Sequence, residues 1–443
     1  MARLKLALWV AMLLPAALWL LADGGALVRA TLYDLRDPSV QLTGVVGIVV
    51  MGLSMVLSAR PAWLEAPLGG LDKMYRLHKW LGIAGLVLSI AHWFWATGIR
   101  WLKDTGLVDL PESAGSLGGG LVLKLPPFYE YTDLAEELGE WSFYALVLLV
   151  AISLLKAIPY RWFRLSHKLL GPIYLLLVFH SVVLTEPRYW TMPVGLVTGA
   201  LMAAGTIGAV ISLLQAIGWT RRVRGSVASL FYIPDLRVLV ITVELRPGWT
   251  GHRPGQFAFL TTDGLEGGHP YSITSPWLGD GKIDFVVKEL GDYTQTLNAT
   301  LKVGDGVLVE GPYGCFDFRD DKPEQIWVGA GIGIAPFLAR LRAHAGSTEQ
   351  QTIYFYHTTG DFDERAIERI TEDATAARLK FRILVDSRDG FLSGQRIRSE
   401  VPGWESASVW FCGPAAFGRS LRRDLVANGL TKSQFHEELF EMR

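Results

Sequence analysis

Cysteine is scarce in this chain of 443 residues, and so is net charge. Only Cys315 and Cys412 occur, too few for an iron–sulfur cluster held by four thiolates and no basis for a disulfide framework. Positive and negative residues nearly cancel, giving a formal net charge of −1, whereas a nucleic-acid partner requires a basic surface. The sequence therefore predicts neither a thiolate-bound cluster nor a nucleic-acid partner.

Charge is scarcest before Arg221, where apolar residues dominate. Mean hydropathy is +0.27 and tryptophan occurs 16 times, so the chain is not wholly soluble. The first run of apolar residues is compatible with a signal peptide, although no small-residue cleavage site follows it. We predict six membrane-spanning helices, each close to the length that crosses a bilayer, at residues 4–22, 40–58, 77–97, 138–158, 167–186 and 191–218.

Lysine and arginine recur in alternate connections between these runs, which sets the predicted orientation. Because short cytoplasmic connections are rich in basic residues, the N-terminus and everything after Arg221 are expected on the inner side of a bacterial-type inner or plasma membrane. The connection at 98–137 then faces outward, and the six spans contact membrane lipid. It is acidic, with Asp104, Asp109, Glu112, Glu130, Asp133, Glu136 and Glu137.

Four histidines interrupt the apolar runs as two pairs. His78 and His92 are 14 residues apart, and His167 and His180 are 13 apart. Fourteen helical residues rise about 21 Å, enough to place one histidine near each face of a bilayer. A lone histidine in such a helix is more often a hydrogen-bonded interior residue. Two pairs instead favour two haem b groups, each held by one imidazole from each of two helices.

The directions of the runs pair His78 with His167 on the inner side and His92 with His180 on the outer side. The unequal spacing is an objection, because at 100° per residue 14 residues nearly restore the helix face and 13 do not. A kink at Gly171-Pro172 is one way to re-aim a ring.

After Arg224 the pattern changes to short strands and turns, linked to the membrane part by the basic stretch 221–225. Strands at 237–245, 256–261, 283–288 and 306–310 predict an antiparallel barrel. Strands at 326–328, 352–356, 381–385 and 408–411 predict an α/β nucleotide-binding layer. The expected domains are 1–220, 221–320 and 321–443.

Two motifs in the predicted barrel suit a flavin. The first offers an aromatic face, hydroxyls and backbone donors in one extended run, although such strings also occur in ordinary strands. The second is a tight turn and a helix start at Thr294, which could present amides to a pyrophosphate or be an ordinary capped helix. The motifs are His269, Pro270, Tyr271, Ser272, Ile273, Thr274 and Ser275, and then Gly291, Asp292, Tyr293 and Thr294.

The α/β layer carries a glycine loop, from Gly329 through Gly331 and Gly333 to Pro336, between a strand and a predicted helix at 337–345. Such a loop lets the backbone approach a dinucleotide pyrophosphate at a helix N-terminus. The spacing is not G-x-G-x-x-G, so this signal alone is weak. Cys412-Gly413-Pro414 ends a later strand, where α/β sheets bind ligands; a buried thiol beside a turn is the alternative.

In this order, the paired histidines, the flavin motif, the turn Gly311 to Gly314, the glycine loop and Cys412-Gly413-Pro414 resemble the ferric reductase and NADPH oxidase superfamily. The resemblance covers nearly the whole chain. It implies a six-helix transmembrane bundle followed by an antiparallel β-barrel that binds FAD and an α/β domain that binds NADP.

The resemblance also implies roles for individual residues. Tyr271 and Ser272 would hold the flavin ring, His269 would approach its phosphate, and the segment 291–294 would complete pyrophosphate binding. Gly329, Gly331 and Gly333 would bind the nicotinamide dinucleotide, with Cys412 near the nicotinamide. Phe440, three residues before the C-terminus, would cover the flavin face, or would be a terminal hydrophobic anchor.

The implied activity is electron transfer from NADPH through FAD and the two haems to an acceptor outside, either a ferric chelate or oxygen. His357, Thr358 and Arg388 could meet a 2′-phosphate, and no acidic residue directly ends the strand at 352–356, which favours NADPH while leaving NADH open. NADPH oxidases have a histidine where this chain has Ala96, which weakens the oxidase interpretation. Two alternatives are an electron-supplying subunit for a periplasmic protein docked on 98–137 and a membrane-tethered reductase without haem.

Overall fold

The protein is described here from a computed structural model, which describes residues 2–28, 35–105, 128–155, 157–264, 266–345 and 351–438. The chain forms two compact units. The first comprises Met1–Leu64 and Lys73–Ile217, and the second comprises Glu65–Asp72 and Gly218–Arg443. Each unit is therefore discontinuous in sequence, because a short segment between two membrane helices folds with the second unit.

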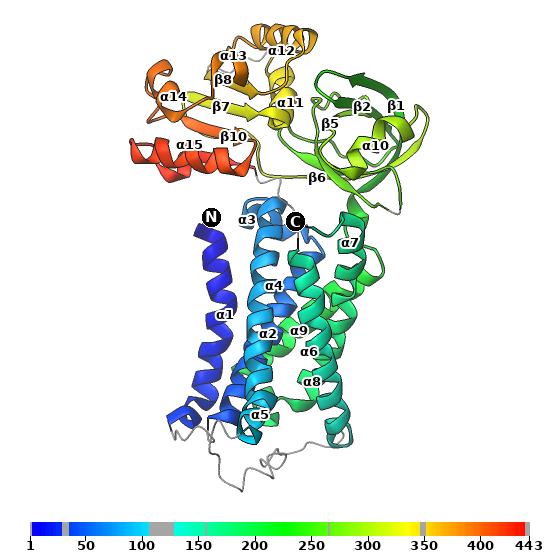
Figure 1. Cartoon of the computed structure of the whole chain (residues 1–443), viewed down its shortest axis with the longest axis vertical. Helices are drawn as coiled ribbons and strands as arrows, with labels where there is room; N and C mark the ends of the chain where they lie inside the picture. Colours follow the sequence, from blue (N-terminus) through cyan, green and yellow to red (C-terminus); the bar gives the residue numbers. More distant parts are fainter. Residues whose placement is uncertain are drawn as a thin grey trace. The chain divides into compact units, whose positions relative to one another are not determined.

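The first unit is helical (Figure 1). Within the described residues, six stretches are long and apolar enough to cross a membrane, as predicted. The short helices α3 (Ala62–Leu68) and α5 (Ile99–Asp104) lie between them in sequence. The long helices are α1 (Ala2–Asp23), α2 (Arg36–Ser58), α4 (Leu71–Trp93), α6 (Thr132–Leu154), α7 (Tyr160–Lys168) with α8 (Leu170–Leu184), and α9 (Pro193–Leu213).

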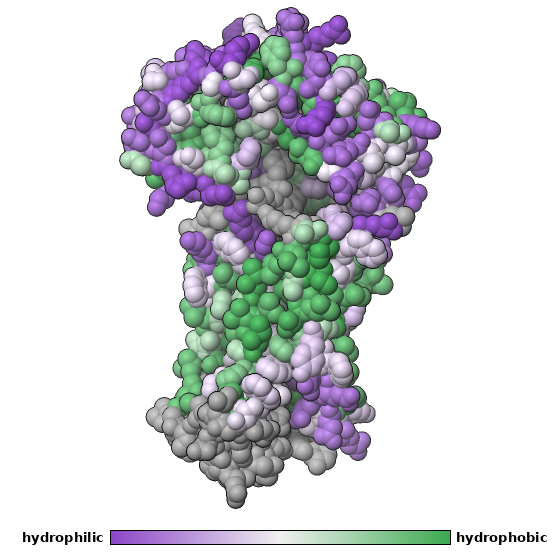
Figure 2. All heavy atoms as spheres, in the orientation of Figure 1, coloured by the Kyte–Doolittle hydropathy of each residue, from purple (hydrophilic) through white to green (hydrophobic). Residues whose placement is uncertain are grey.

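Apolar residues predominate along these spans, except in α7, whose sequence contains Arg161, Arg164 and Lys168. Hydrophobic side chains cover much of the visible face of the helical unit (Figure 2). Leu148, Leu196 and Ile207 point outward and are 61–65% exposed, which is costly in water but favourable in lipid. The first unit is an integral membrane domain.

The chain interrupts its fifth span at Leu169, between α7 and α8. Pro172 in the first turn of α8 has no amide hydrogen for the helical bond to residue 168. His167 and His180 therefore lie on separate helices, whereas His78 and His92 share the uninterrupted α4. The break lies next to Gly171-Pro172, between the two histidines that are 13 residues apart.

The second unit begins with an antiparallel sheet of six strands in the order β4-β3-β6-β1-β2-β5. A bridge between Ile273 and Phe285 joins its two outer strands and closes the sheet into the predicted barrel. Leu260, Ile283 and Val309 fill its core. The strands are β1 (Arg222–Ile233), β2 (Val238–Leu245), β3 (Phe257–Thr261), β4 (His269–Ser272), β5 (Lys282–Lys288) and β6 (Gly306–Tyr313).

The predicted linker at 221–225 is wrong, because β1 already begins at Arg222 and pairs there with Glu310 of β6. Because Arg222 and Arg224 at the start of β1 are basic, the sequence was interpreted there as a linker and not as a strand. The helix α10 (Asp292–Thr300) follows β5 and begins two residues before the predicted Thr294.

A parallel sheet in the order β11-β10-β7-β8-β9 completes the second unit, as predicted for the α/β layer. The predicted strands are present and longer, and β11 was missed because it has only three residues. The boundary at 320/321 falls between the two sheets, and we keep it as a proposed domain boundary. The elements are β7 (Glu324–Ala330), α11 (Ala335–His344), β8 (Thr352–Thr359), α12 (Glu364–Ala376), β9 (Lys380–Val385), α13 (Asp386–Asp389), α14 (Gly394–Glu400), β10 (Ser408–Cys412), α15 (Ala415–Ala427) and β11 (Phe435–Glu437).

Candidate electron-transfer sites

The four membrane histidines meet in the pairs expected from the directions of the spans. The ring centroids of His78 and His167 are 5.9 Å apart, with planes 69° from parallel. Those of His92 and His180 are 6.0 Å apart, at 83°. We call these the 78/167 pair and the 92/180 pair. Two sites of nearly equal geometry therefore lie one above the other along α4.

In the 78/167 pair, serines of neighbouring helices orient both rings. Nδ1 of His78 lies 2.9 Å from the carbonyl oxygen of Ser54 and 3.0 Å from its hydroxyl. Nδ1 of His167 lies 2.9 Å from the hydroxyl of Ser153, whose own proton goes to the carbonyl of Leu149 at 2.7 Å. Since that hydroxyl must accept, Nδ1 of His167 carries the proton and Nε2 keeps its lone pair.

In the 92/180 pair, a main-chain carbonyl orients each ring, and a threonine hydroxyl also contacts His92. Nδ1 of His92 lies 3.1 Å from the carbonyl oxygen of Val40 and 3.2 Å from the hydroxyl of Thr43. Nδ1 of His180 donates to the carbonyl of Ala135 at 2.8 Å. His180 packs directly on α6, where a Cβ placed on Gly139 would lie 2.2 Å from its Nδ1. Only glycine at 139 admits the ring in this position.

These features fit a haem in each pair. A metal ion bound at about 2 Å by one nitrogen of each imidazole requires ring centroids roughly 6 Å apart. A hydrogen bond at Nδ1 fixes the tautomer that presents Nε2 to a metal. No three metal-binding side chains gather within the described residues, so a metal held here by two histidines must bring its remaining ligands, as iron in a porphyrin does.

The flavin motif lies on β4, at the seam of the barrel. Tyr271 Oη and Ser272 Oγ are buried, and neither has a hydrogen-bond partner among the described residues. Burial, and then the neighbouring Tyr293, raises the pKa of Tyr271, so its hydroxyl remains a donor. Two adjacent buried hydroxyls without partners fit a polar ligand that accepts from them.

The two flavin motifs, separate in sequence, meet in space. The rings of His269 and Tyr293 stack with centroids 4.2 Å apart, and Tyr293 Oη hydrogen-bonds Thr262. Thr294 accepts the amides of Leu290 and Gly291 through its hydroxyl, at 3.0 and 3.1 Å, which caps α10. The aromatic stack leaves the start of α10 next to β4, as a pyrophosphate site requires.

The remaining residues of the first motif close the barrel. Ile273 is fully buried and bridges Phe285. Thr274 donates from its amide to the carbonyl of Asp284 at 2.8 Å, and Ser275 Oγ accepts the amide of Asp284 at 3.0 Å. A direct flavin role is therefore best supported for Tyr271 and Ser272.

The glycines of the α/β loop have different surroundings. Gly331 has φ +55° and open space around its Cβ position, so the backbone there is free to approach a ligand. A Cβ on Gly333 would lie 2.3 Å from the carbonyl oxygen of Cys412, and one on Gly329 would lie 3.0 Å from Ile334. Gly333 and Gly329 thus allow close packing of the loop, and Pro336 is buried in the first turn of α11.

Cys412 ends β10 beside this loop, as predicted, but its side chain is fully buried in a cluster with Phe337, Phe355 and Trp410. Burial raises the pKa of its thiol well above the ordinary value, with Glu438 adding to the effect. The thiol therefore stays protonated and cannot act as a nucleophile. Phe440 lies outside the described residues.

Sequence reasoning missed Glu65, which belongs to the second unit. Its carboxylate accepts the amide of Gly314 at 2.7 Å and pairs with Arg221 at 3.1 Å. Arg221 also donates to the carbonyl of Pro312 at 2.9 Å and lies over the ring of Tyr313. The predicted turn 311–314 is thus held by a residue 249 positions away, which no local pattern could reveal.

Comparison with known proteins assigns the two units separately. A family described as "Ferric reductase like transmembrane component" matches residues 43–178, and one described as "FAD-binding domain" matches residues 222–316. The two matches occur in the order of a ferric reductase and NADPH oxidase type fusion, which agrees with the family that the sequence resembles. The ferric-reductase-like match contains His78, His92 and His167, and the FAD-binding match contains both flavin motifs.

Individual relatives match about half of the chain. The toluate 1,2-dioxygenase electron transfer component of Pseudomonas putida is 28% identical over 199 residues, which are 42% of this chain and 58% of that protein. The propane 2-monooxygenase reductase component of Mycolicibacterium smegmatis is 26% identical over 239 residues, 47% and 68% of the two chains. This chain therefore spans 58% of the length of the first relative.

Solved structures are more distant. A flavohemoglobin from Malassezia yamatoensis has a TM-score of 0.49 at 15% identity, covering 91% of this chain and 98% of that chain. An Amycolatopsis cytochrome P450 reductase has a TM-score of 0.43 at 21% identity, and the match covers 50% of this chain and 70% of that chain. The family matches carry the assignment: the protein is an integral membrane protein with a ferric-reductase-like transmembrane component and an FAD-binding domain.

Proposed function

We propose that this protein carries electrons across the membrane, from NADPH or NADH at its FAD-binding half to an acceptor on the outer side, by way of two bis-histidine haems. The single observation that carries the proposal is the pair of histidine sites. Both have ring centroids about 6 Å apart, and all four rings have Nδ1 engaged by hydrogen bonds. FAD supplies the exchange between hydride and single electrons, and haem iron carries one electron at a time.

The chain's own residues supply binding and orientation. Tyr271 and Ser272 donate to the flavin, and the open backbone at Gly331 receives the dinucleotide. The 78/167 pair receives electrons first and the 92/180 pair passes them on. This direction rests on the distribution of lysine and arginine, which places the N-terminus and the C-terminal half in the cytoplasm of a bacterial-type cell.

The acceptor is a ferric chelate or oxygen, the latter giving superoxide. Directly after His92 the helix widens into a π-helical turn, Phe94–Gly98, which contains Ala96. Such turns are frequent at functional sites. Arg36 donates to the carbonyl of Ala96 at 3.1 Å, so a cation lies beside the outer end of the 92/180 pair. With no histidine at position 96, the ferric chelate is the first acceptor to test.

A second candidate function is the supply of electrons to a periplasmic protein. The acidic connection 98–137 is the feature that favours it, although residues 106–127 lie outside the described residues. In that case the haems are reduced but neither small acceptor turns over above background.

The central test is haem content. In the purified protein, His92→Ala should lower haem from two per chain to one and abolish turnover with outer acceptors, while reduction of FAD by nucleotide persists. Ser89→Ala is the matched control, because Ser89 lies on the same helix and donates only to its own backbone at Gly85. Two haems in His92→Ala, or no haem in the native protein, would refute the proposal.

Superoxide-dismutase-sensitive reporter reduction and ferric chelate turnover, measured on the same preparation, separate the acceptors. Rapid ferric turnover that superoxide dismutase leaves unchanged supports a ferric reductase. Turnover of the reporter that superoxide dismutase removes supports an oxidase.

A further inference from the structure

We propose that Asp386 makes NADH the preferred hydride donor of this protein over NADPH. The inference rests on the proposed function, because it takes the dinucleotide to bind at the carboxyl edge of the parallel sheet. It runs against the NADPH preference expected from the sequence, which depended on the absence of an acidic residue at the end of the strand 352–356.

The structure extends that strand to Thr359 and brings a carboxylate to its end from the neighbouring strand. Asp386 directly follows β9, and its Oδ1 accepts the hydroxyl proton of Thr358 in β8 at 2.9 Å. Its Oδ2 lies 3.8 Å from the Cβ position of Gly360. In dinucleotide-binding folds, an acidic residue at this edge accepts the ribose 2′-hydroxyl of NAD, whereas a cation receives the 2′-phosphate of NADP.

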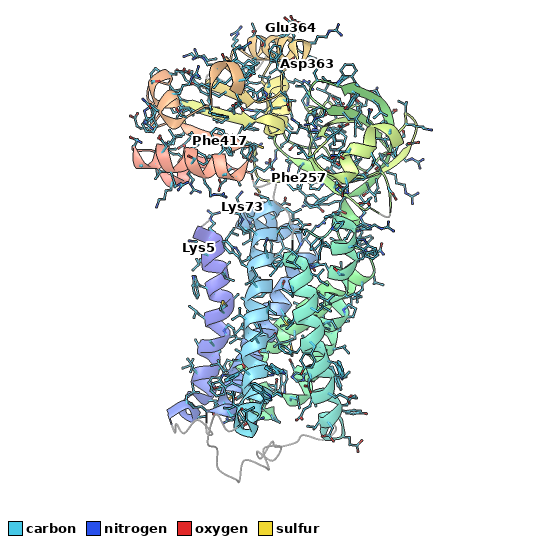
Figure 3. The ribbon with its side chains drawn as sticks, in the orientation of Figure 1. Lys5, Lys73, Phe257, Asp363, Glu364 and Phe417 are labelled. Carbon is cyan, nitrogen blue, oxygen red and sulfur yellow. The ribbon has the colours of Figure 1, made fainter. Side chains whose placement is uncertain are left out.

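The other carboxylates at this edge are already engaged. Asp361 pairs with Lys288 of β5. Asp363, which precedes Glu364 at the start of α12 (Figure 3), accepts the amide of Ala366 and caps that helix. Asp389 accepts the amide of Val385 at 2.9 Å.

By contrast, among the described residues Asp386 accepts a side-chain hydrogen bond only from Thr358. An ionised carboxylate offers about four acceptor positions. Asp386 can therefore still accept a hydrogen bond from a ribose hydroxyl, whereas the other three carboxylates already bind groups of the protein.

The residues expected to meet a 2′-phosphate have other partners. Arg388 pairs with Asp389 at 3.2 Å and lies over the ring of Phe362. His357 is buried and hydrogen-bonded through Nδ1 to the carbonyl of Gly329 at 3.0 Å, and burial lowers its pKa to about 4, so it is neutral at pH 7. A phosphate carries up to two negative charges, and placing it beside Asp386 without a free cation is unfavourable.

The same edge offers the rest of a dinucleotide site. Phe362 and Phe391 are large apolar side chains that are 45% and 80% exposed after β8 and β9, and flat aromatic faces of this kind suit an adenine ring. Gly331 at the end of the first strand leaves open backbone for the pyrophosphate. Asp386 follows the third strand of the same sheet.

The test compares both dinucleotides with the full-length, FAD-loaded protein. Dissociation constants of NAD⁺ and NADP⁺ are measured by titration calorimetry, and kcat/KM is measured for NADH and NADPH. We expect the native protein to favour NADH in both readouts. Asp386→Asn should weaken NAD⁺ binding about tenfold, the loss typical of a hydrogen bond to a charged group, and leave NADP⁺ binding unchanged or improved.

Glu372→Gln is the matched control, since it removes the same charge from an exposed position on α12 and should leave the NADH to NADPH ratio unchanged. A native preference for NADPH, or equal loss of both nucleotides in Asp386→Asn, overturns the inference. If neither nucleotide binds or reduces the flavin, the proposed function fails instead.

Discussion

The 78/167 pair and the 92/180 pair have nearly the same ring geometry and differ in how one ring of each pair is oriented. His78 and His92 each contact both a carbonyl and a hydroxyl, from Ser54 in one pair and from Val40 and Thr43 in the other. Among the described residues, Nδ1 of His167 contacts the hydroxyl of Ser153, whereas Nδ1 of His180 contacts the carbonyl of Ala135. A hydroxyl can be removed by one substitution, whereas a main-chain carbonyl moves only with its helix. The orientation of His167 is therefore open to side-chain substitution, and that of His180 depends on how closely it packs on α6.

The largest effect should come from removing one histidine of each pair. His167→Ala should leave the 92/180 haem in place but unreduced by nucleotide, because its electron supply is cut. His180→Ala should leave a haem that nucleotide still reduces, and both variants should lose turnover with outer acceptors by more than about 100-fold. Stopped-flow absorption at the haem bands distinguishes the two variants. If both behave identically, the proposed direction of electron transfer is wrong.

Gly139→Val should damage the 92/180 pair alone. The new side chain would occupy the position of the His180 ring, so we expect loss of one haem with the other retained, measured by the pyridine haemochrome assay. Gly199→Val is the control, because Gly199 lies on α9, which carries none of the four histidines, and the nearest atom to a Cβ there belongs to the Trp190 ring at 3.4 Å. Full haem content in Gly139→Val would show that His180 does not depend on this close approach.

The smallest effect should come from Ser153→Ala. The variant removes the only side-chain acceptor given to Nδ1 of His167 within the described residues, so the haem should remain bound with affinity lowered about 10–100-fold and a shifted potential. Redox titration of each haem provides the measurement. Thr198→Ala, which removes a hydroxyl bonded only within α9, should leave both potentials unchanged, and a Ser153→Ala variant equal to it would contradict the orienting role of Ser153.

Features that repeat along one segment could be predicted from the sequence. Span length and apolarity gave six helices that the structure confirms, and the directions of the spans gave the histidine pairing. Alternating strands gave most of both sheets, because side-chain periodicity is a local property. The position of the break at Leu169, between α7 and α8, needed the structure.

Contacts between distant segments could not be predicted. In the sequence, Gly139 is one of many small residues in an apolar span. Only the structure shows that the ring of His180 packs against it. Asp386 lies 28 residues from its partner Thr358 and acts at the end of a strand other than its own. The start of β1, residues 222–224, was mistaken for a linker because its partner, β6, lies about 80 residues later in the chain. Each case requires the pairing of elements, which no window of sequence contains.

The membership of Glu65 in the second unit limits how the protein can be divided. A fragment beginning at Gly218 would contain both sheets, yet it would leave the guanidinium of Arg221 without its carboxylate and the amide of Gly314 without its acceptor. Loss of a charged partner at a partly buried site costs about 1–3 kcal/mol. The flavin-binding half is therefore expected to lose stability when it is cut from the chain at Gly218, because the segment Glu65–Asp72, encoded between two membrane helices, belongs to it.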